Sequence, residues 1–206
     1  ERITGRDFFG RVRTAIDECL DAGLRVKVNA VAMRGINDHE LKAFLDLTRV
    51  LPIDMRFIEH MPMGDAVPWN PAEFWSADEI LEQASRLADL EPEERDATSS
   101  GPARMFRIRG GKGRLGLISP LSNHFCGSCN RLRITADGRL RTCLFSDKEY
   151  RLRPAVRARG GAAAVRARLA RIMRCALRTK PVGVELLRAR KLGAPVALRR
   201  MQAIGG

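Results

Sequence analysis

The sequence predicts an α/β fold with parallel strands and crossover helices, and three observations support this prediction. Residues 1–95 alternate between helical and strand-like hydrophobic periodicity, the connecting segments are short, and the strand-like runs are apolar enough to be buried. At 206 residues and 45% hydrophobic, the chain can bury the core of one large or two small domains.

The first helix and strand follow from the pattern at the start of the chain. Apolar residues recur at helical spacing and comprise Phe8, Val12, Ile16, Cys19 and Leu20. Thr4 is a candidate N-cap for this helix, and Gly23 is a candidate stop. The Val-rich segment 26–33 then predicts a buried strand.

Two more helices and one strand are predicted before residue 90. Asn37 or Asp38 can cap a helix with the apolar residues Leu41, Phe44, Leu45 and Leu51. A strand is expected at about 55–61, and Ser76 is expected to cap a helix with Ile80, Leu81, Ala84 and Leu87. Two strands cannot close a barrel, and the alternation is already under way at residue 1. We therefore expect preceding βα units to be missing from this chain.

The second half of the chain has a different organisation. Residues 91–102 are polar and read as a linker, and two strands are expected at 103–109 and 114–119. A hairpin is expected from 131–135 and 140–143, joined by the turn residues 136–138. Basic helices at roughly 149–158 and 162–178 and an irregular Arg-rich tail follow. We predict two parts, residues 1–95 and 96–206.

Charge and composition narrow the classes of partner. The 37 Lys and Arg exceed the 24 Asp and Glu by 13, which favours an anionic partner such as nucleic acid, a phosphate-bearing molecule or an anionic surface. Aromatic residues are only 5%, so the stacking platforms of single-strand binders are poorly supplied. We see neither an apolar run long enough for a membrane helix nor a signal-peptide pattern.

The five cysteines are too few, and odd in number, for a disulfide scaffold. Cys19 and Cys175 stand alone in helical patterns, and we expect them to be buried, inert thiols. Cys126 and Cys129 form a C-x2-C motif in which Gly127 allows a tight backbone, and Cys143 follows after thirteen intervening residues. The predicted hairpin would fold Cys143 back toward the pair, which indicates a metal site.

The cysteine motif alone leaves the metal open. A structural zinc site needs four ligands, and His124 or Cys175 could complete it. A [4Fe–4S] cluster held by three cysteines would instead leave one iron open to a substrate atom. Arg131 and Arg133 alternate along the next strand, so they either flank the metal and bind an anionic substrate or form a solvated basic face.

Three residues of the first half carry similar alternatives. Lys27 lies in a predicted apolar strand, where it could bind phosphate or pair with Glu59. Arg56 lies at the edge of the next predicted strand. Met61 is more often core filler than a ligand contact.

Three segments resemble one known family closely. VKVNAVAMRGINDHE (26–40), RFIEHMPMGD (56–65) and FCGSCNRLRITADGRLRTCLF (125–145) resemble molybdenum cofactor biosynthesis protein A, a family of lyase-type radical S-adenosylmethionine enzymes with GTP 3',8-cyclase activity. The resemblance runs in order from about Ile3 to Tyr150. It implies that the chain is the C-terminal part of an incomplete (β/α) radical-SAM barrel, followed by a cluster-binding β-hairpin and a helical extension.

The resemblance also implies roles for individual residues. Cys126, Cys129 and Cys143 would hold a [4Fe–4S] cluster with an open iron. The GTP site would include Lys27, Arg131, Leu132, Arg133 and, with a weaker match, Arg56. Met61 would contact S-adenosylmethionine, and Gly205 and Gly206 resemble a double-glycine tail that enters the active site.

The family's first cluster motif, C-x3-C-x2-C, is absent from these residues. We therefore expect the S-adenosylmethionine cluster to belong to a missing N-terminal half, and this chain alone to be inactive. The implied partners are GTP, S-adenosylmethionine and, downstream, cyclic pyranopterin monophosphate synthase, with a second copy of the chain as a candidate. The implied location is the cytoplasm, or the mitochondrial matrix in a eukaryote. The alternatives are a basic zinc module that binds nucleic acid and a noncatalytic paralogue.

Overall fold

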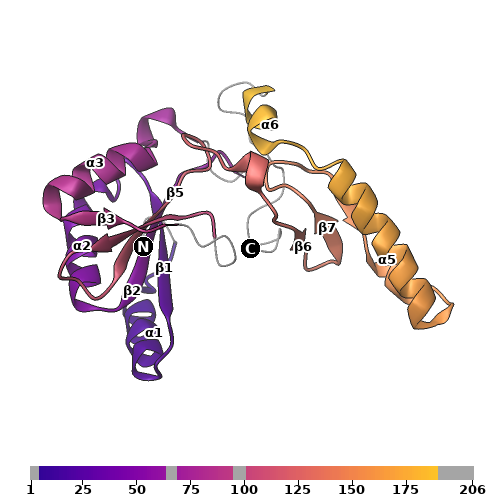
Figure 1. Ribbon diagram of the computed structural model, residues 1–206, viewed down its shortest axis with the longest axis horizontal. Helices are drawn as coiled ribbons and strands as arrows, with labels where there is room; N and C mark the ends of the chain where they lie inside the picture. Colours follow the sequence, from indigo (N-terminus) through magenta and orange to yellow (C-terminus); the bar gives the residue numbers. More distant parts are fainter. Residues whose placement is uncertain (1–4, 64–68, 95–100, 190–206) are drawn as a thin grey trace. The chain divides into compact units, whose positions relative to one another are not determined.

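The computed structural model describes residues 5–63, 69–94 and 101–189 (Figure 1). The chain divides into two compact units. Unit 1 comprises Glu1–His60 and Ala72–Asn123, and unit 2 comprises Met61–Pro71 and His124–Gly206. Thr4 and the glycine pair at 205–206 lie outside the described residues. None of the described helices is long and apolar enough to cross a membrane.

Unit 1 is built on one mixed five-stranded sheet with the strand order β1-β2-β5-β4-β3. Strands β1 (Val26–Ala32), β2 (Ile53–Glu59) and β5 (Arg114–Ile118) are parallel. Strands β4 (Arg104–Ile108) and β3 (Leu90–Pro92) add to it in antiparallel pairings. The prediction of an α/β fold with parallel strands is confirmed, and the second strand begins two residues earlier than expected.

The helices of unit 1 are α1 (Phe9–Asp21), α2 (Leu41–Val50) and α3 (Ala77–Leu87), with short 3-10 turns η1 (Asp38–Glu40) and η2 (Pro71–Glu73). Gly23 follows the end of α1 with φ of +71°, as expected of a stop residue. Ser76 caps α3 in a reciprocal capping box with Glu79. Asn37 does not cap a helix through its side chain, because its amide bridges Met33 N and Val31 O in the loop after β1.

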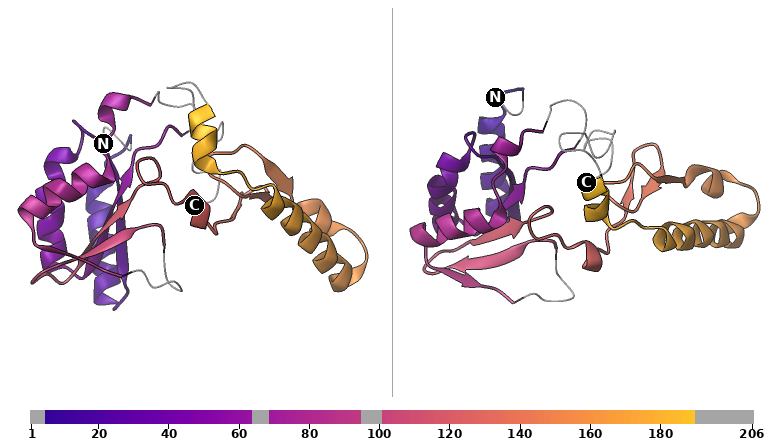
Figure 2. Two further views of the ribbon diagram at one scale, coloured as in Figure 1. Left: turned by 45° about the horizontal axis from the view of Figure 1, so that its top comes forward. Right: turned by 90° about the horizontal axis from the view of Figure 1, so that it is seen from above.

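The two faces of this sheet differ sharply in chemistry. Alternate residues such as Met55 and Phe57 of β2 point toward α2 and α3, which cover that face (Figure 2), and form the hydrophobic core of unit 1. Phe57 makes edge-on ring contacts with Phe44 and Trp75. The intervening residues carry charge, including Asp54 and Arg56 of β2. Because side chains alternate between the two faces of a strand, these charged residues lie on the face opposite the core.

The apolar stripe of α1 is not buried as its spacing predicted. The helix has no fully buried residue in the described structure, and Val12 is 54% exposed. The adjacent Phe9 is 80% exposed. The helical prediction for this segment is therefore confirmed, whereas packing of its apolar face is not seen.

The structure places the division between the two units later than residue 95. The predicted strands at 103–109 and 114–119 form β4 and β5, and β5 pairs with β2 in the centre of the sheet. Gly113, just before β5, lies so close to the start of β2 and to α2 that a Cβ atom there would be 2.4 Å from Ile53 O and 2.9 Å from Thr48 Cγ2. The polar segment is consequently a connection within unit 1, and unit 2 resumes at His124.

Unit 2 contains a three-stranded sheet followed by helices. The sheet comprises β6 (Arg133–Ile134), β7 (Arg139–Arg141) and β8 (Glu149–Arg151), preceded by the 3-10 turn η3 (Cys126–Ser128). The helices are α4 (Arg153–Arg157), α5 (Gly161–Arg178) and α6 (Gly183–Ala189). The hairpin and α5 confirm their predictions. The predicted helix at 149–158 was wrong at its start, which forms β8, and α6 lies in the tail expected to be irregular.

Candidate metal centre

Two of the predicted ligands, Cys126 and Cys129, lie on one tight turn of unit 2. Cys126 is the first residue of η3 and Cys129 follows it, and Cys129 N donates to Cys126 O at 3.3 Å. Gly127 was expected to be needed for this turn, but it has no positive φ, and no atom lies within 4 Å of a Cβ built on it. The 3-10 turn therefore brings the backbones of the two cysteines together without needing a left-handed glycine.

Cys143 reaches the same region from the other end of the hairpin. Burial raises the pKa of its thiol, and the nearby thiolates of Cys126 and Cys129 raise it further. Gly183 of α6 packs directly on it, since a Cβ atom there would lie 2.9 Å from Cys143 Sγ and 2.7 Å from Phe145 Cδ2. The close approach of α6, which the sequence did not indicate, encloses the third cysteine.

The three cysteines are electrostatic neighbours, but they do not form a single-ion site. Within the described ranges, no group of three or more His, Cys, Asp or Glu side chains could hold one metal ion. Cys175, expected to be buried, is exposed on α5, and His124 is exposed as well. Among the residues that the structure describes, neither candidate for a fourth zinc ligand is buried with the cysteines.

Lys180, which the sequence analysis missed, contacts the cysteine loop directly. Its Nζ donates to Cys129 O at 2.5 Å and to Arg131 O at 3.2 Å, and it lies 3.7 Å from Cys129 Sγ. The Lys-Pro pair at the end of α5 is the only local signal that marks this residue in the sequence. A cation is thereby held beside a candidate metal ligand, and it joins the end of α5 to the loop.

Arg131 and Arg133 occupy different environments despite their alternation. The Arg131 guanidinium lies over the Phe125 ring, 4.9 Å from its centroid. Arg133 is half-buried in β6; burial lowers its pKa, as does the nearby Arg131, whereas Cys129 and Cys143 act in the opposite direction. Arg133 is thus the half-buried guanidinium whose pKa responds to Cys129 and Cys143. Leu132 between them is also half-buried.

The segment after Cys143 is held by a buried arginine. Arg141 is fully buried and donates to Glu149 Oε1 at 3.1 Å and to Ser146 O. Two buried atoms beside Cys143 have no hydrogen-bond partner among the described residues, Nε of Arg141 and Oγ1 of Thr142. The loop that carries Cys143 therefore rests on a buried ion pair.

Lys27 and Arg56 lie on neighbouring strands of unit 1. Lys27 is exposed on the polar face of β1. The alternative that it pairs with Glu59 is wrong, because Glu59 is buried near the opposite end of β2 and accepts hydrogen bonds from Ala77 N and Leu121 N. Since Lys27 is exposed, the cost of burying an unpaired charge does not arise.

Arg56 is largely buried, with 17% of its side chain exposed, and lies 3.7 Å from Asp54. Its stem lies over Gly116, where a Cβ would be 2.8 Å from Arg56 Cγ. Met61 is half-buried and belongs to unit 2, as do the cysteines. Lys27 and Arg56 thus lie on adjacent strands of unit 1, whereas Met61 and the three cysteines belong to unit 2.

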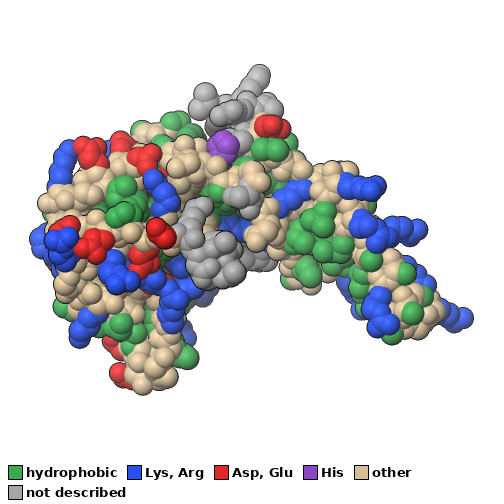
Figure 3. Space-filling view, viewed as in Figure 1, with side chains coloured by type: hydrophobic (Ala, Val, Ile, Leu, Met, Phe, Trp, Pro, Cys, Tyr) green, Lys and Arg blue, Asp and Glu red, His purple; other side chains and the backbone are tan. Residues whose placement is uncertain are grey.

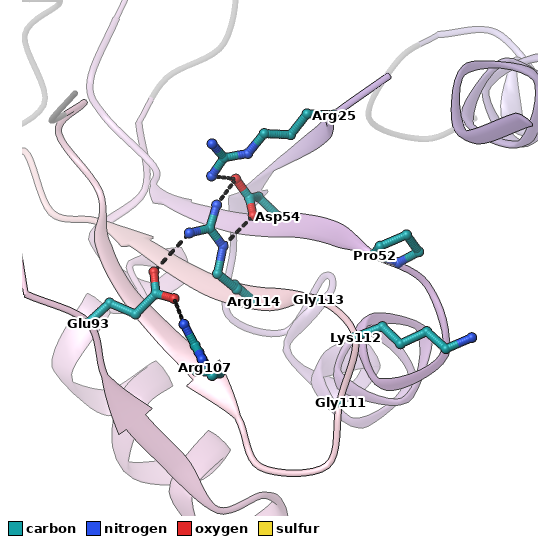
Figure 4. A pocket seen from close by; sticks show the side chains of 9 residues that line it. All are labelled: Arg25, Pro52, Asp54, Glu93, Arg107, Gly111, Lys112, Gly113 and Arg114. Carbon is teal, nitrogen blue, oxygen red and sulfur yellow. Dashed lines mark hydrogen bonds and ion pairs between the residues drawn. The ribbon is translucent and has the colours of Figure 1, made fainter. Parts of the chain in front are cut away.

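The polar face of unit 1 also contains a cavity of about 320 Å³ (Figure 4). Arg114 donates to both oxygens of Asp54, at 2.7 and 2.9 Å, and to Glu93 at 2.9 Å. Arg25 and Arg107 pair with the same two carboxylates. The carboxylates of this cavity are thus shared among its guanidinium groups, which indicates a structural ion-pair network.

Comparison with known proteins assigns the family. The model of the Molybdenum Cofactor Synthesis C family matches residues 53–186, which include the three clustered cysteines. A GTP 3',8-cyclase from Alkaliphilus oremlandii is 45% identical over 156 residues, covering 75% of this chain and 47% of that protein. One from Desulforamulus reducens is 42% identical over 180 residues, covering 87% and 54%.

A mammalian relative extends the similarity beyond bacteria. Molybdenum cofactor biosynthesis protein 1 of Mus musculus is 45% identical over 162 residues, covering 77% of this chain and 25% of that protein. This chain belongs to the Molybdenum Cofactor Synthesis C family. It spans about half the length of the bacterial relatives described above.

Proposed function

We propose that this chain is the GTP-binding half of a GTP 3',8-cyclase of molybdenum cofactor biosynthesis, with Cys126, Cys129 and Cys143 holding a [4Fe–4S] cluster. The observation that carries the proposal is the family match over these cysteines, which the fold surrounds with the cations of Arg133 and Lys180. The proposed reaction is taken from the names of the two bacterial relatives, which are GTP 3',8-cyclases.

The donor set fits an iron–sulfur cluster better than a zinc ion. Ligands of a four-iron cluster bind different iron atoms, so their sulfur atoms lie further apart than those around a single ion. Cys126 and Cys129 both lie near enough to Cys143 to shift the pKa of its thiol, as three ligands of one cluster would. The Lys180 and Arg133 cations would offset the negative charge of the thiolate ligands.

Each residue then has a distinct task. When bound, the cluster would supply an open iron to the purine of GTP. Arg133, with Arg131 and Leu132, would orient the nucleotide through charge-assisted hydrogen bonds and contact. Lys27 and Arg56 would bind its phosphates from the polar face of unit 1, and Met61 would contact S-adenosylmethionine, with Gly205 and Gly206 as the active-site tail.

The proposal extends to the whole reaction. The unit 1 sheet would form part of a radical-SAM barrel, and a second cluster would cleave S-adenosylmethionine. Because these 206 residues contain no C-x3-C-x2-C motif, we do not expect them to generate the radical alone. Cyclic pyranopterin monophosphate synthase would use the product, and a homodimer is the assembly that we propose to test first.

Replacing Arg133 with alanine tests the nucleotide site. GTP binding to the anaerobically reconstituted chain should weaken by about 10- to 100-fold, because a charge-assisted hydrogen bond contributes about 1.5–3 kcal/mol. Isothermal titration calorimetry measures the change. Arg174→Ala, an exposed change on α5, is the control and should leave GTP binding within about twofold. Equal loss in both variants would indicate non-specific charge attraction and overturn the GTP assignment.

Replacing Lys180 with methionine tests the support of the cluster. The variant keeps most of the length of the side chain but loses the donor to Cys129, so iron affinity should fall about 10- to 100-fold, as for other groups that orient metal ligands. The cluster's reduction potential should also become more negative, because a nearby positive charge is lost. Iron content and a redox titration report the two effects.

Lys148→Met is the matched control for this experiment. Lys148 is exposed, and its ammonium lies over the Tyr150 ring rather than on a cysteine. Unchanged iron content and potential in Lys180→Met would show that the contact has no role in holding or tuning the cluster. A loss of the same size in Lys148→Met would attribute the effect to net charge.

A further inference from the structure

The positive charge of the chain is concentrated in unit 2. Residues 124–189 contain sixteen Lys and Arg against four Asp and Glu. Figure 3 shows acidic and basic side chains intermixed over unit 1, whereas basic side chains line the visible side of α5. In unit 1 most arginines meet a carboxylate, as Arg114 does in Figure 4. Unit 2 has too few carboxylates to repeat that pattern.

Part of this unmatched charge surrounds a cavity of about 310 Å³ that we name the hairpin pocket. It lies at the turn between β6 and β7 and is lined by Asp137, Arg139, Arg151, Arg153 and Arg157, with Gly138 and Pro154. Its one carboxylate, Asp137, is already held by Arg139 at 2.9 Å and by Thr135. Arg151, Arg153 and Arg157 make no side-chain hydrogen bond or ion pair within the described part of the chain.

The pocket arginines are placed where they repel one another. Arg139 and Arg151 are directly opposite in the antiparallel pairing of β7 and β8, where like charges are unfavourable. Arg153 and Arg157 are four residues apart in α4, another unfavourable like-charge spacing. Arg139 is compensated by Asp137 and Glu149, whereas the exposed Arg151, Arg153 and Arg157 have no carboxylate partner among the described residues.

The backbone also makes room for one of these arginines. Gly138 has φ of +76°, and a Cβ atom there would lie 2.6 Å from Arg153 Cγ and 2.9 Å from its Cδ. The absence of a side chain at Gly138 consequently allows both the turn and the position of the Arg153 side chain. Part of the ordering that a ligand would require is thus already present in the fold.

We propose that the hairpin pocket binds a small phosphate-bearing anion, distinct from the GTP proposed above. Three unpaired guanidinium groups carry more positive charge and more N–H donors than a single carboxylate ligand can match. A phosphate carries up to two negative charges, and its several oxygens can each accept from a planar guanidinium group. The concave shape and limited volume favour a molecule of pyrophosphate size over an extended nucleic-acid backbone. The pocket shares no residue with the proposed cluster and GTP sites.

Pyrophosphate binding by the metal-free 206-residue chain in 0.15 M salt tests this proposal. The measurement is made in an Arg133→Ala background, so that neither the iron nor the proposed GTP site contributes. We expect Arg151→Ala and Arg153→Ala each to weaken binding at least tenfold, with Arg174→Ala on α5 changing it less than twofold. A parallel titration with a single-stranded oligonucleotide should show weaker binding that falls steeply with salt.

Three results would overturn the proposal. One is absence of pyrophosphate binding, and another is an equal effect of Arg174→Ala, which would indicate general attraction to basic side chains. The third is tighter binding of the oligonucleotide than of pyrophosphate at 0.15 M salt, which would assign the pocket to a nucleic-acid backbone. Circular dichroism of each variant separates loss of the site from loss of the fold. None of these results depends on iron, so they leave the proposed cyclase function to its own tests.

Discussion

Replacing Cys126, Cys129 or Cys143 with alanine is expected to abolish iron–sulfur cluster binding by this chain. Reconstitution without oxygen should yield a brown protein with sulfide-to-iron charge-transfer absorption. Each cysteine would bind a separate iron, and two remaining thiolates would leave two irons without protein ligands. Iron and acid-labile sulfide per chain, measured beside the absorption spectrum, should fall to background in each variant.

Cys19→Ala and Cys175→Ala are the matched controls. Both remove a free thiol outside the candidate centre, one half-buried in α1 and the other exposed on α5, and both should retain full iron content. A colourless protein that holds one tightly bound zinc per chain would contradict the cluster assignment and favour the zinc module. Retention of iron in all three cysteine variants would place the cluster elsewhere.

Replacing Glu59 with alanine is expected to destabilise unit 1 strongly. The carboxylate is 1% exposed and accepts from the backbone N–H groups of Ala77, Leu121 and Ser122 at 2.9–3.0 Å, and from the Ser122 hydroxyl. The variant leaves these donors without their acceptor. Each buried unpaired donor costs about 1–3 kcal/mol, and water can reach part of this loop, so we expect a net loss of about 3 kcal/mol.

Urea unfolding followed by circular dichroism measures this loss. Glu82→Ala is the control, because that carboxylate is 65% exposed and forms only an ion pair with Arg86 one helical turn away. Such a pair contributes a few tenths of a kcal/mol. Equal midpoints for the two variants would mean that Glu59 is not the connection between β2, α3 and the loop after β5 that its contacts indicate.

The local patterns predicted the secondary elements of unit 1 well, but not all of their packing. Ser76 correctly predicted the start of α3, because the capping box involves only the four residues from Ser76 to Glu79. The stripe containing Val12 predicted a helix correctly but not its exposure. Residues 149–151 were predicted to be helical but form β8, where Glu149 lies opposite Arg141 and pairs with it. A tertiary contact there overrides local propensity.

The sequence likewise predicted some features of the candidate site and missed others. The C-x2-C spacing and the hairpin turn indicated which cysteines approach one another. They did not reveal Lys180, which lies 51 residues after Cys129, or Gly183 against Cys143. The alternative that Lys27 pairs with Glu59 was wrong because side chains alternate between the two faces of a sheet. Lys27 and Glu59 lie on opposite faces.

By itself, the sequence determined the α/β class, the parallel strands, the hairpin and the three candidate metal ligands, since each depends on periodicity or spacing within a short stretch. Only the tertiary structure decided that β4 and β5 complete the first sheet, that α6 encloses Cys143, and that Arg151 and Arg153 meet at one pocket. Contacts of this kind form between segments that are far apart in the sequence and that burial of the core brings together. The hydrophobic periodicity of one segment does not indicate which distant segment it will contact.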